Sequence, residues 1–285
     1  MKRSTPSLRS MYSRMLAALG ATVAAGALIA APTLAGTAHA DGTKTLTIAL
    51  TQEIDSLNPF QAYFSSSTQI GRLMYDFLTA YDAKDTHPIG GVADKWSYTK
   101  DKKTWTFHIA DGHKWSDGKP VTAQDVAFTY NLIMTNEDAA KANGNFVTNF
   151  KSVVAKDDHT LVITTKAPQA TMLALDIPIV PEHIWKGQSP KNYKPEDHLP
   201  AVGDGPFILT DYKAGQYVKF KANKDYWRGA PKIDQLVFQE FSNPDAAVQA
   251  LQKGEVDLIS GTNAAQTRAL EKDKNITVNK AQGKR

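Results

Sequence analysis

The chain has 285 residues, of which 42% are hydrophobic and none is cysteine, and it carries 33 basic against 29 acidic residues. The whole basic excess lies in the first forty residues, so the remainder is formally neutral and gives no global electrostatic reason to expect a nucleic acid or an anionic membrane as partner. The lack of cysteine excludes disulfides, a thiolate metal site, a cysteine nucleophile and a lipid anchor on an N-terminal cysteine.

The first forty residues have the composition of an export signal. A basic start is followed by the apolar run Met15–Ala31, then by Pro32 and a stretch of small residues. The tripeptide from Ala38 to Ala40 is of the A-x-A type and predicts cleavage before Asp41. A membrane anchor is the alternative, since seventeen apolar residues approach the length of a bilayer span. We expect residues 1–40 to be a signal peptide and the mature chain to be located outside the cell or on the periplasmic side of the envelope.

The mature chain begins with a predicted buried strand, Thr45–Leu50, followed by a loop and a helix over Thr68–Leu78. Alternating hydrophobicity then predicts a hairpin over Lys95–Ile109, with Trp105 and its i+2 and i+4 neighbours on the apolar face. Thr122 with Asp125 resembles a capping box for a helix that ends near Met134, and Lys151–Thr165 gives a second hairpin. These elements predict a small α+β domain over 90–168, inserted between two parts of a first lobe, 41–89 and 169–285.

The last part of the chain predicts strands that run in parallel. A hairpin joins Phe207–Tyr212 to Tyr217–Ala222, and Leu236–Phe241 is a further strand. Asn243 and Pro244 then favour the start of a helix that reaches Lys253, with Gly254 as its C-terminal glycine. The short strand Val256–Ile259 follows. Strand, helix and strand of these lengths indicate a right-handed βαβ unit and therefore a parallel sheet.

Four stretches, in this order, resemble the solute-binding proteins of peptide, dipeptide and nickel ABC importers. They are IDSLNPF followed by GRLMYDFL, the segment Val92–Tyr130, AVGDGPFIL followed by ANKDYW-x-GAPKID, and QALQKGEVDLI, which ends at Ile259. One departure lies at Asp204, where relatives commonly have Thr between the two glycines; Asp also suits a turn.

This resemblance implies an α/β fold of the periplasmic-binding-protein kind, type II-like and two-lobed, with the small extra domain. Relatives continue well past residue 285, and no element there closes the fold. We therefore expect an N-terminal fragment, or a truncated reading frame, in which the hinge and most of the second lobe are missing.

Candidate ligand contacts follow from topology, since ligands of open α/β sheets bind outside the carboxyl ends of the strands. One candidate is the segment after the first strand, which resembles the family segment that lies along the ligand backbone. The other follows the strand Val256–Ile259. The candidate residues are Tyr63, Phe64, Ser65, Ser66, Ser260, Gly261, Thr262 and Asn263. Ordinary solvated loops are the alternative interpretation of both segments.

Reactive and metal-binding motifs are not evident in the sequence. His108 and His113 have neither a carboxylate cluster nor a third histidine near them in sequence, so we expect a surface or turn role and no metal site. The aromatic residues Trp96, Trp105, Phe107 and Trp115 are interpreted as core, and Asp125 as a helix-start carboxylate. The sequence contains neither a G-x-S-x-G elbow nor an H-E-x-x-H helix.

The resemblance favours a binding protein and not an enzyme. We expect a monomer without a cofactor that captures peptides, or a related small solute, and delivers them to ABC permease subunits in the membrane. A secreted peptide hydrolase and a truncated, non-functional remnant are the alternatives. The identity of the ligand is left open between an oligopeptide, a dipeptide, a nickel chelate and a sugar.

Overall fold

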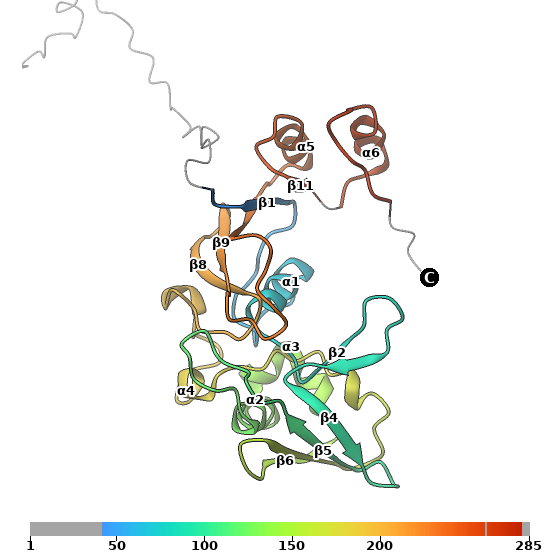
Figure 1. Ribbon diagram of the computed structural model, residues 1–285, viewed down its shortest axis with the longest axis vertical. Helices are drawn as coiled ribbons and strands as arrows, with labels where there is room; N and C mark the ends of the chain where they lie inside the picture. The colour runs from blue at the N-terminus through green and yellow to red at the C-terminus, as the bar shows by residue number, and fades with distance from the viewer. Residues whose placement is uncertain (1–41, 260, 281–285) are drawn as a thin grey trace, which may run out of the picture. The chain divides into compact units, whose positions relative to one another are not determined.

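A computed structural model describes residues 42–259 and 261–280. The predicted signal peptide and its cleavage residues Ala38, Ala40 and Asp41 lie outside the described residues, as does Ser260. Figure 1 labels most of the elements, and its colours follow their order along the chain.

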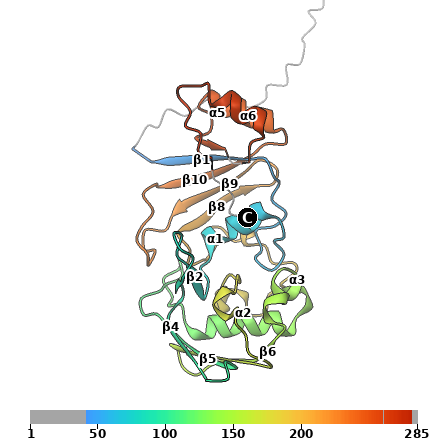
Figure 2. The same cartoon turned by 90° about the vertical axis from the view of Figure 1, so that its right-hand side faces the viewer.

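A five-stranded mixed sheet carries the first candidate site. Its strand order is β11-β1-β10-β9-β8, and Figure 2 shows β1, β10, β9 and β8 side by side. β1 pairs in parallel with both β10 and β11, whereas β9 is antiparallel to both of its neighbours, β10 and β8. The strands are β1 (Thr45–Leu50), β8 (Phe207–Lys213), β9 (Tyr217–Ala222), β10 (Gln235–Glu240) and β11 (Leu258–Ile259). The predicted parallel direction is confirmed, with β1 inserted between the two strands of the predicted βαβ unit.

Three helices accompany this sheet: α1 (Ser65–Met74), α5 (Pro244–Gln252) and α6 (Ala264–Leu270). The Asn243 side chain caps α5 by accepting from the Asp245 N–H at 2.8 Å. Gly254 then adopts a φ of 72°, as expected of the glycine after a helix. α5 contacts β11 and α6, and α1 contacts β8.

The predicted bounds of α1 are wrong at both ends. The helix starts at Ser65 and stops at Met74, four residues before the predicted end at Leu78. Tyr75 is extended, with φ −132° and ψ 139°, and the Met74 carbonyl accepts a 2.9 Å hydrogen bond from the Gly205 N–H. A partner from a distant loop thus takes the carbonyl at the end of the helix, an interaction that helical periodicity does not reveal.

A second, antiparallel sheet of order β4-β5-β7-β6 forms from the segment predicted as an inserted domain. Its strands are β4 (Ala93–Tyr98), β5 (Thr104–Ile109), β6 (Phe150–Ala155) and β7 (Thr160–Thr165). α2 (Ala123–Thr135) packs against β6 and β7, and α3 (Glu137–Val147) packs against α2. α3 is absent from the sequence prediction, because Asn143 and Gly144 lower helix propensity in its middle.

Several short elements complete the described chain. β2 (Thr79–Tyr81) and β3 (Pro88–Gly90) form a separate two-stranded ribbon. α4 (Glu182–Trp185) and the 3₁₀ turns Met172–Ala174 and Pro195–Asp197 lie in the proline-rich stretch before β8. One continuous cluster of buried apolar side chains extends from the five-stranded sheet through α1 into the second sheet, so the two parts share a core. The boundaries 90 and 168 stay a prediction.

Candidate functional site

The connections that lead to the two predicted ligand segments begin at the same edge of the five-stranded sheet. β1 and β11 are parallel neighbours with the register Ile48 to Leu258 and Ala49 to Ile259, so their carboxyl ends lie side by side. The chain leaves β1 toward Tyr63 and leaves β11 toward Asn263. β10 is also parallel to β1 and ends at this edge. The topology therefore places the strand ends from which both connections start at one sheet edge, where open α/β sheets bind ligands.

The loop after β1 is folded back on the start of α1. The Asp55 carboxylate accepts from the Tyr63 N–H at 2.8 Å and from the Phe64 N–H at 3.3 Å. The Ser67 hydroxyl in turn accepts from the Asp55 N–H at 3.0 Å. These bonds fix the backbone but leave both rings accessible, with Tyr63 57% and Phe64 39% exposed. The loop can offer two aromatic faces to a ligand.

The two serines of this segment already have partners within the loop. Ser65 donates to the Gln52 side-chain oxygen at 2.8 Å. Ser66 is buried, and its hydroxyl donates to the Glu53 carbonyl at 2.7 Å. The Ser66 side chain thus stabilises the loop in this structure, and its contact with ligand stays a prediction. Sequence reasoning did not identify Gln52 and Asp55 as the residues whose side chains hold this loop. The only indication in the sequence is that both precede the start of α1 by about ten residues.

The segment after β11 forms the start of α6. Gly261 has a φ of +77°, in the left-handed region that favours glycine. The Asn263 side chain accepts from the N–H groups of Ala265 and Gln266, both at 2.9 Å, in a capping box. Thr262 and Thr267 join their hydroxyls at 2.9 Å. Ligand contacts by Gly261, Thr262 and Asn263 stay a prediction. Because the side chains of Thr262 and Asn263 are already hydrogen-bonded within the protein, we expect the backbone groups of this segment to contribute more to ligand binding.

The residues of the longest matching stretch are structural, as expected. Trp105, Phe107 and Trp115 are buried, and Trp96 packs at the edge of the same core. The Asp125 carboxylate accepts from the Thr122 N–H at 2.9 Å, which confirms the predicted capping box. Its second oxygen accepts from the Glu182 N–H at 2.9 Å, a contact that joins α2 to α4.

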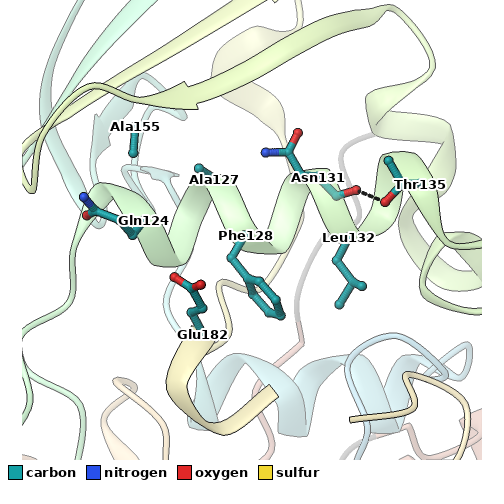
Figure 3. Close-up of a pocket in the computed structure, with 8 residues that line it drawn as sticks. All are labelled: Gln124, Ala127, Phe128, Asn131, Leu132, Thr135, Ala155 and Glu182. Atoms are coloured by element: carbon teal, nitrogen blue, oxygen red, sulfur yellow. Dashed lines mark hydrogen bonds between the residues drawn. The ribbon is translucent and has the colours of Figure 1, made fainter. Parts of the chain in front are cut away.

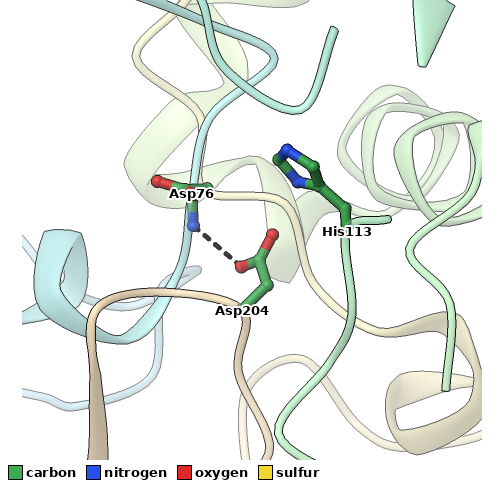
Figure 4. A group of neighbouring side chains, drawn as sticks. All are labelled: Asp76, His113 and Asp204. Carbon is green, nitrogen blue, oxygen red and sulfur yellow. Dashed lines mark hydrogen bonds between the residues drawn. The ribbon is translucent and has the colours of Figure 1, made fainter. Parts of the chain in front are cut away.

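A separate polar cluster lies inside the protein and corrects the expectation for His113. His113 was expected at a surface or turn, yet it is buried with its ring 4.1 Å from that of Trp227. The sequence neighbours of His113 do not reveal its burial, because Trp227, which packs against its ring, comes from a distant loop. Asp76 and Asp204 are its buried neighbours (Figure 4). His108 is partly exposed on β5, as expected, and binds Asp94 at 2.7 Å.

Burial determines the electrostatics of this cluster. It raises the pKa of Asp76, although hydrogen bonds from Trp227 and Tyr226 and the charge of Arg228 act in the opposite direction. Burial, followed by the charge of Asp76, raises the pKa of Asp204 well above its ordinary value. Burial lowers the pKa of His113 to about 4, so its imidazole is neutral at pH 7.

A pocket of about 450 Å³ lies elsewhere, along α2 (Figure 3). Its lining runs from Gln124 to Thr135 on the helix and includes Ala155 and Glu182. It contains none of the predicted ligand residues for which the structure gives a position. Over the same described part of the chain, no helix combines the length and apolar character that crossing a bilayer requires.

The mixed sheet with candidate ligand loops at its carboxyl edge defines a fold of the periplasmic-binding-protein class, and solved structures of that class superpose on it. The oligopeptide-binding protein AppA of Bacillus subtilis, solved with a nonapeptide, gives a TM-score of 0.72 at 26% identity over 82% of this chain and 47% of its own. The substrate-binding protein CtaP of Listeria monocytogenes gives 0.71 at 29% identity over 80% and 47%.

The chain belongs to the bacterial extracellular solute-binding proteins, family 5, whose middle-region model matches residues 87–285. In sequence, AppA is 31% identical over 219 residues, which are 75% of this chain and 40% of AppA. The dipeptide-binding protein of Escherichia coli is 31% identical over 227 residues, 72% of this chain and 42% of the relative. The chain thus spans less than half the length of these curated relatives. The family and the relatives named here are solute-binding proteins.

Proposed function

We propose that this chain is the ligand-capturing component of an ABC importer, which binds peptides or a related small solute and delivers them to membrane permease subunits. The observation that carries the proposal is the juxtaposition of the loops after β1 and β11 at one edge of a sheet, in a chain of the solute-binding family. The relatives named for oligopeptide and dipeptide binding indicate the ligand class.

The geometry favours recognition of an extended backbone. Tyr63 and Phe64 present exposed rings, and the main chain beside them is fixed by Asp55. Aromatic faces bury apolar area at little entropic cost, and free main-chain groups can pair with a peptide. Such contacts suit ligands that differ in side chains but share a backbone. The proposal needs no cofactor, no nucleic acid and no catalytic residue.

The proposal includes export and action as a monomer outside the cytoplasm. It is supported by the signal-like composition of residues 1–40 and by the extracellular class to which the family belongs. In proteins of this kind a ligand is held between two lobes, and closure presents it to the permease. The matched relatives are more than twice as long as the part aligned here. We expect residues 41–285 expressed alone to bind peptides at about millimolar affinity, since they would supply only part of the contacts of such a two-lobed site.

An NMR titration of residues 41–285 with a defined pentapeptide tests the proposal. Peptide-induced shifts should be concentrated at 63–66 and 261–263. Tyr63→Ala combined with Phe64→Ala should weaken binding about tenfold, as expected for loss of a central aromatic contact. Tyr98→Ala is the matched control, because Tyr98 is similarly exposed on β4 and outside both loops.

Two results would overturn the proposal. Shifts centred on the α2 pocket would place the site elsewhere. The second is cleavage of the peptide, which mass spectrometry of the incubated sample detects: peptide fragments that accumulate with time would indicate the hydrolase alternative.

A further inference from the structure

Three buried polar side chains meet where the two sheets share their core. Asp76 follows α1, His113 lies between β5 and α2, and Asp204 precedes β8. They are 8%, 2% and 2% exposed. One nitrogen or oxygen from each lies within 4.8 Å of those of the other two. Figure 4 shows the His113 ring and the Asp204 carboxylate directed toward the same space.

Part of the hydrogen-bonding capacity of this cluster is unused, although both carboxylate oxygens of Asp76 accept hydrogen bonds, from Tyr226 and Trp227. Both ring nitrogens of His113 and the Oδ2 atom of Asp204 are buried without a hydrogen-bond partner. Leaving such a group unpaired in a protein interior costs about 1–3 kcal/mol, so native proteins seldom do so. A neutral imidazole has one acceptor nitrogen, so one His113 nitrogen and Asp204 Oδ2 are the two unpaired atoms that can offer a lone pair to an ion between them.

The charges around the space favour a cation. A carboxylate oxygen from each of Asp76 and Asp204 lies within 4.8 Å of a His113 ring nitrogen. Arg228 is the nearby base whose charge lowers the pKa of Asp76. Its guanidinium donates to the Gly90 carbonyl at 2.6 Å and lies over the Trp227 ring. A doubly charged ion would offset the two buried carboxylates directly and would accept a lone pair from His113.

We propose that Asp76, His113 and Asp204 form a binding site for one divalent transition-metal ion of the zinc type. Imidazole together with carboxylate is a common ligand set for such ions, with three protein ligands and one position left for water. Bonds of about 2.0–2.2 Å bring ligand atoms to about 3.5 Å from one another, so side-chain movements of about 1 Å complete the site. The ion would join α1, the β5–α2 connection and the approach to β8. This inference is independent of the proposed peptide binding.

A second acidic cluster provides an internal control. Asp82, Asp85 and His87 also converge within 4.8 Å, but on the turn between β2 and β3, where Asp85 and His87 are exposed and already paired with each other. His87→Leu removes a histidine from the surface cluster, as His113→Leu does from the buried one. Asp204→Asn removes the charge while its side-chain oxygen can still accept from the Asp76 N–H.

The experiment is a zinc titration of the full chain after treatment with EDTA, followed by calorimetry and thermal melts. We expect one equivalent of Zn²⁺ to bind and to raise the melting temperature, because the ion binds only the folded state. Asp204→Asn and His113→Leu should each weaken binding at least about 100-fold, and His87→Leu should leave it unchanged. Far-UV circular dichroism of each metal-free variant checks that it is folded.

Other outcomes overturn the site. No binding by wild type, or equal binding by folded Asp204→Asn, would show that the buried cluster holds no metal. Binding lost only in His87→Leu would assign the zinc to the surface cluster. Bound Co²⁺ gives a second readout, since its visible absorption should depend on His113 and not on His87.

Discussion

The Oδ1 atom of Asp204 accepts a hydrogen bond of 2.8 Å from the backbone N–H of Asp76, in a segment that is distant in sequence. The neighbouring Gly205 N–H donates to the Met74 carbonyl at 2.9 Å. Together these bonds satisfy a donor and an acceptor just where α1 ends, so the loop before β8 acts as the C-terminal cap of α1.

Two substitutions of Asp204, to Ala and to Asn, distinguish the contribution of its hydrogen bond from that of its charge. Asp204→Ala leaves the buried Asp76 N–H unpaired and should lower the free energy of unfolding by about 1–3 kcal/mol relative to Asp204→Asn, which keeps an acceptor. Urea melts of the two variants in EDTA measure the difference. Equal stabilities would show that the bond contributes nothing.

Stability should also depend on pH through Asp204 in the metal-free protein. Its folded-state pKa is raised well above the ordinary 3.8. The folded state therefore holds this proton at pH values where the unfolded chain has lost it, and stability falls as pH rises from about 3.8 through the folded-state pKa. Asp204→Asn has no such titrating group at residue 204 and should not lose stability in this way. Asp76 and His113 are present in both proteins, so the comparison isolates the effect of Asp204. Melts from pH 4 to 8 should show a stability difference that grows with pH in favour of Asn. A constant difference would contradict the raised pKa.

Gly205 is expected to tolerate no side chain. A Cβ atom there would lie 2.4 Å from the Leu73 carbonyl oxygen, which is backbone and cannot rotate away. Gly205→Ala should cost about 3 kcal/mol. Gly71→Ala is the matched control: it lies within α1 with nothing within 4 Å of the added atom, and it should stabilise the protein by about 0.5–1 kcal/mol. Denaturant melts compare the two, and a similar sign for both would refute the close-contact argument.

Trp105 is buried on β5, with its ring 4.5 Å from Tyr98 and 6.2 Å from Phe107. Trp105→Ala should cost about 3–5 kcal/mol through lost burial and a cavity. Val154→Ala, at an exposed position of β6 in the same sheet, should change stability by less than about 0.5 kcal/mol. A loss below about 1 kcal/mol for Trp105→Ala would mean that the core tolerates its removal.

Cleavage of the predicted signal should leave Asp41 as the first residue of the exported protein. The Ala38–Ala40 tripeptide supplies the small residues that such cleavage requires. Ala40→Asp should block it, whereas Ala40→Ser should not. N-terminal sequencing of exported protein decides the point, and an intact Met1 would favour the anchor alternative.

Local chemistry made most elements predictable from sequence. The hairpin containing Trp105 follows from alternation, and the starts of α2 and α5 follow from Asp125 and Asn243, whose side chains bond backbone groups two or three residues away. Such signals are contained in a few consecutive residues. The end of α1 was not predictable in this way, because its carbonyl partner is Gly205.

The buried cluster was unpredictable for the same reason. His113 was judged by its sequence neighbours, yet Asp76, Asp204 and Trp227 reach it from three distant segments. The candidate ligand edge could be located because parallel strands align their carboxyl ends by rule. The sequence could not show which side chains at this edge are available to a ligand, since the hydrogen bonds of Ser66 and Asn263 to backbone groups depend on the detailed path of each loop.

The position of β1 between β10 and β11 has a consequence for the order of folding. The first strand of the described chain has both of its partners near the other end, with Thr45 opposite Gln235 and Ile48 opposite Leu258. The hairpins of the four-stranded sheet, by contrast, close over short loops and can form early. β1 thus has no sheet partner until residues 235–259 have been synthesised, so the candidate ligand edge assembles after the hairpins of the four-stranded sheet.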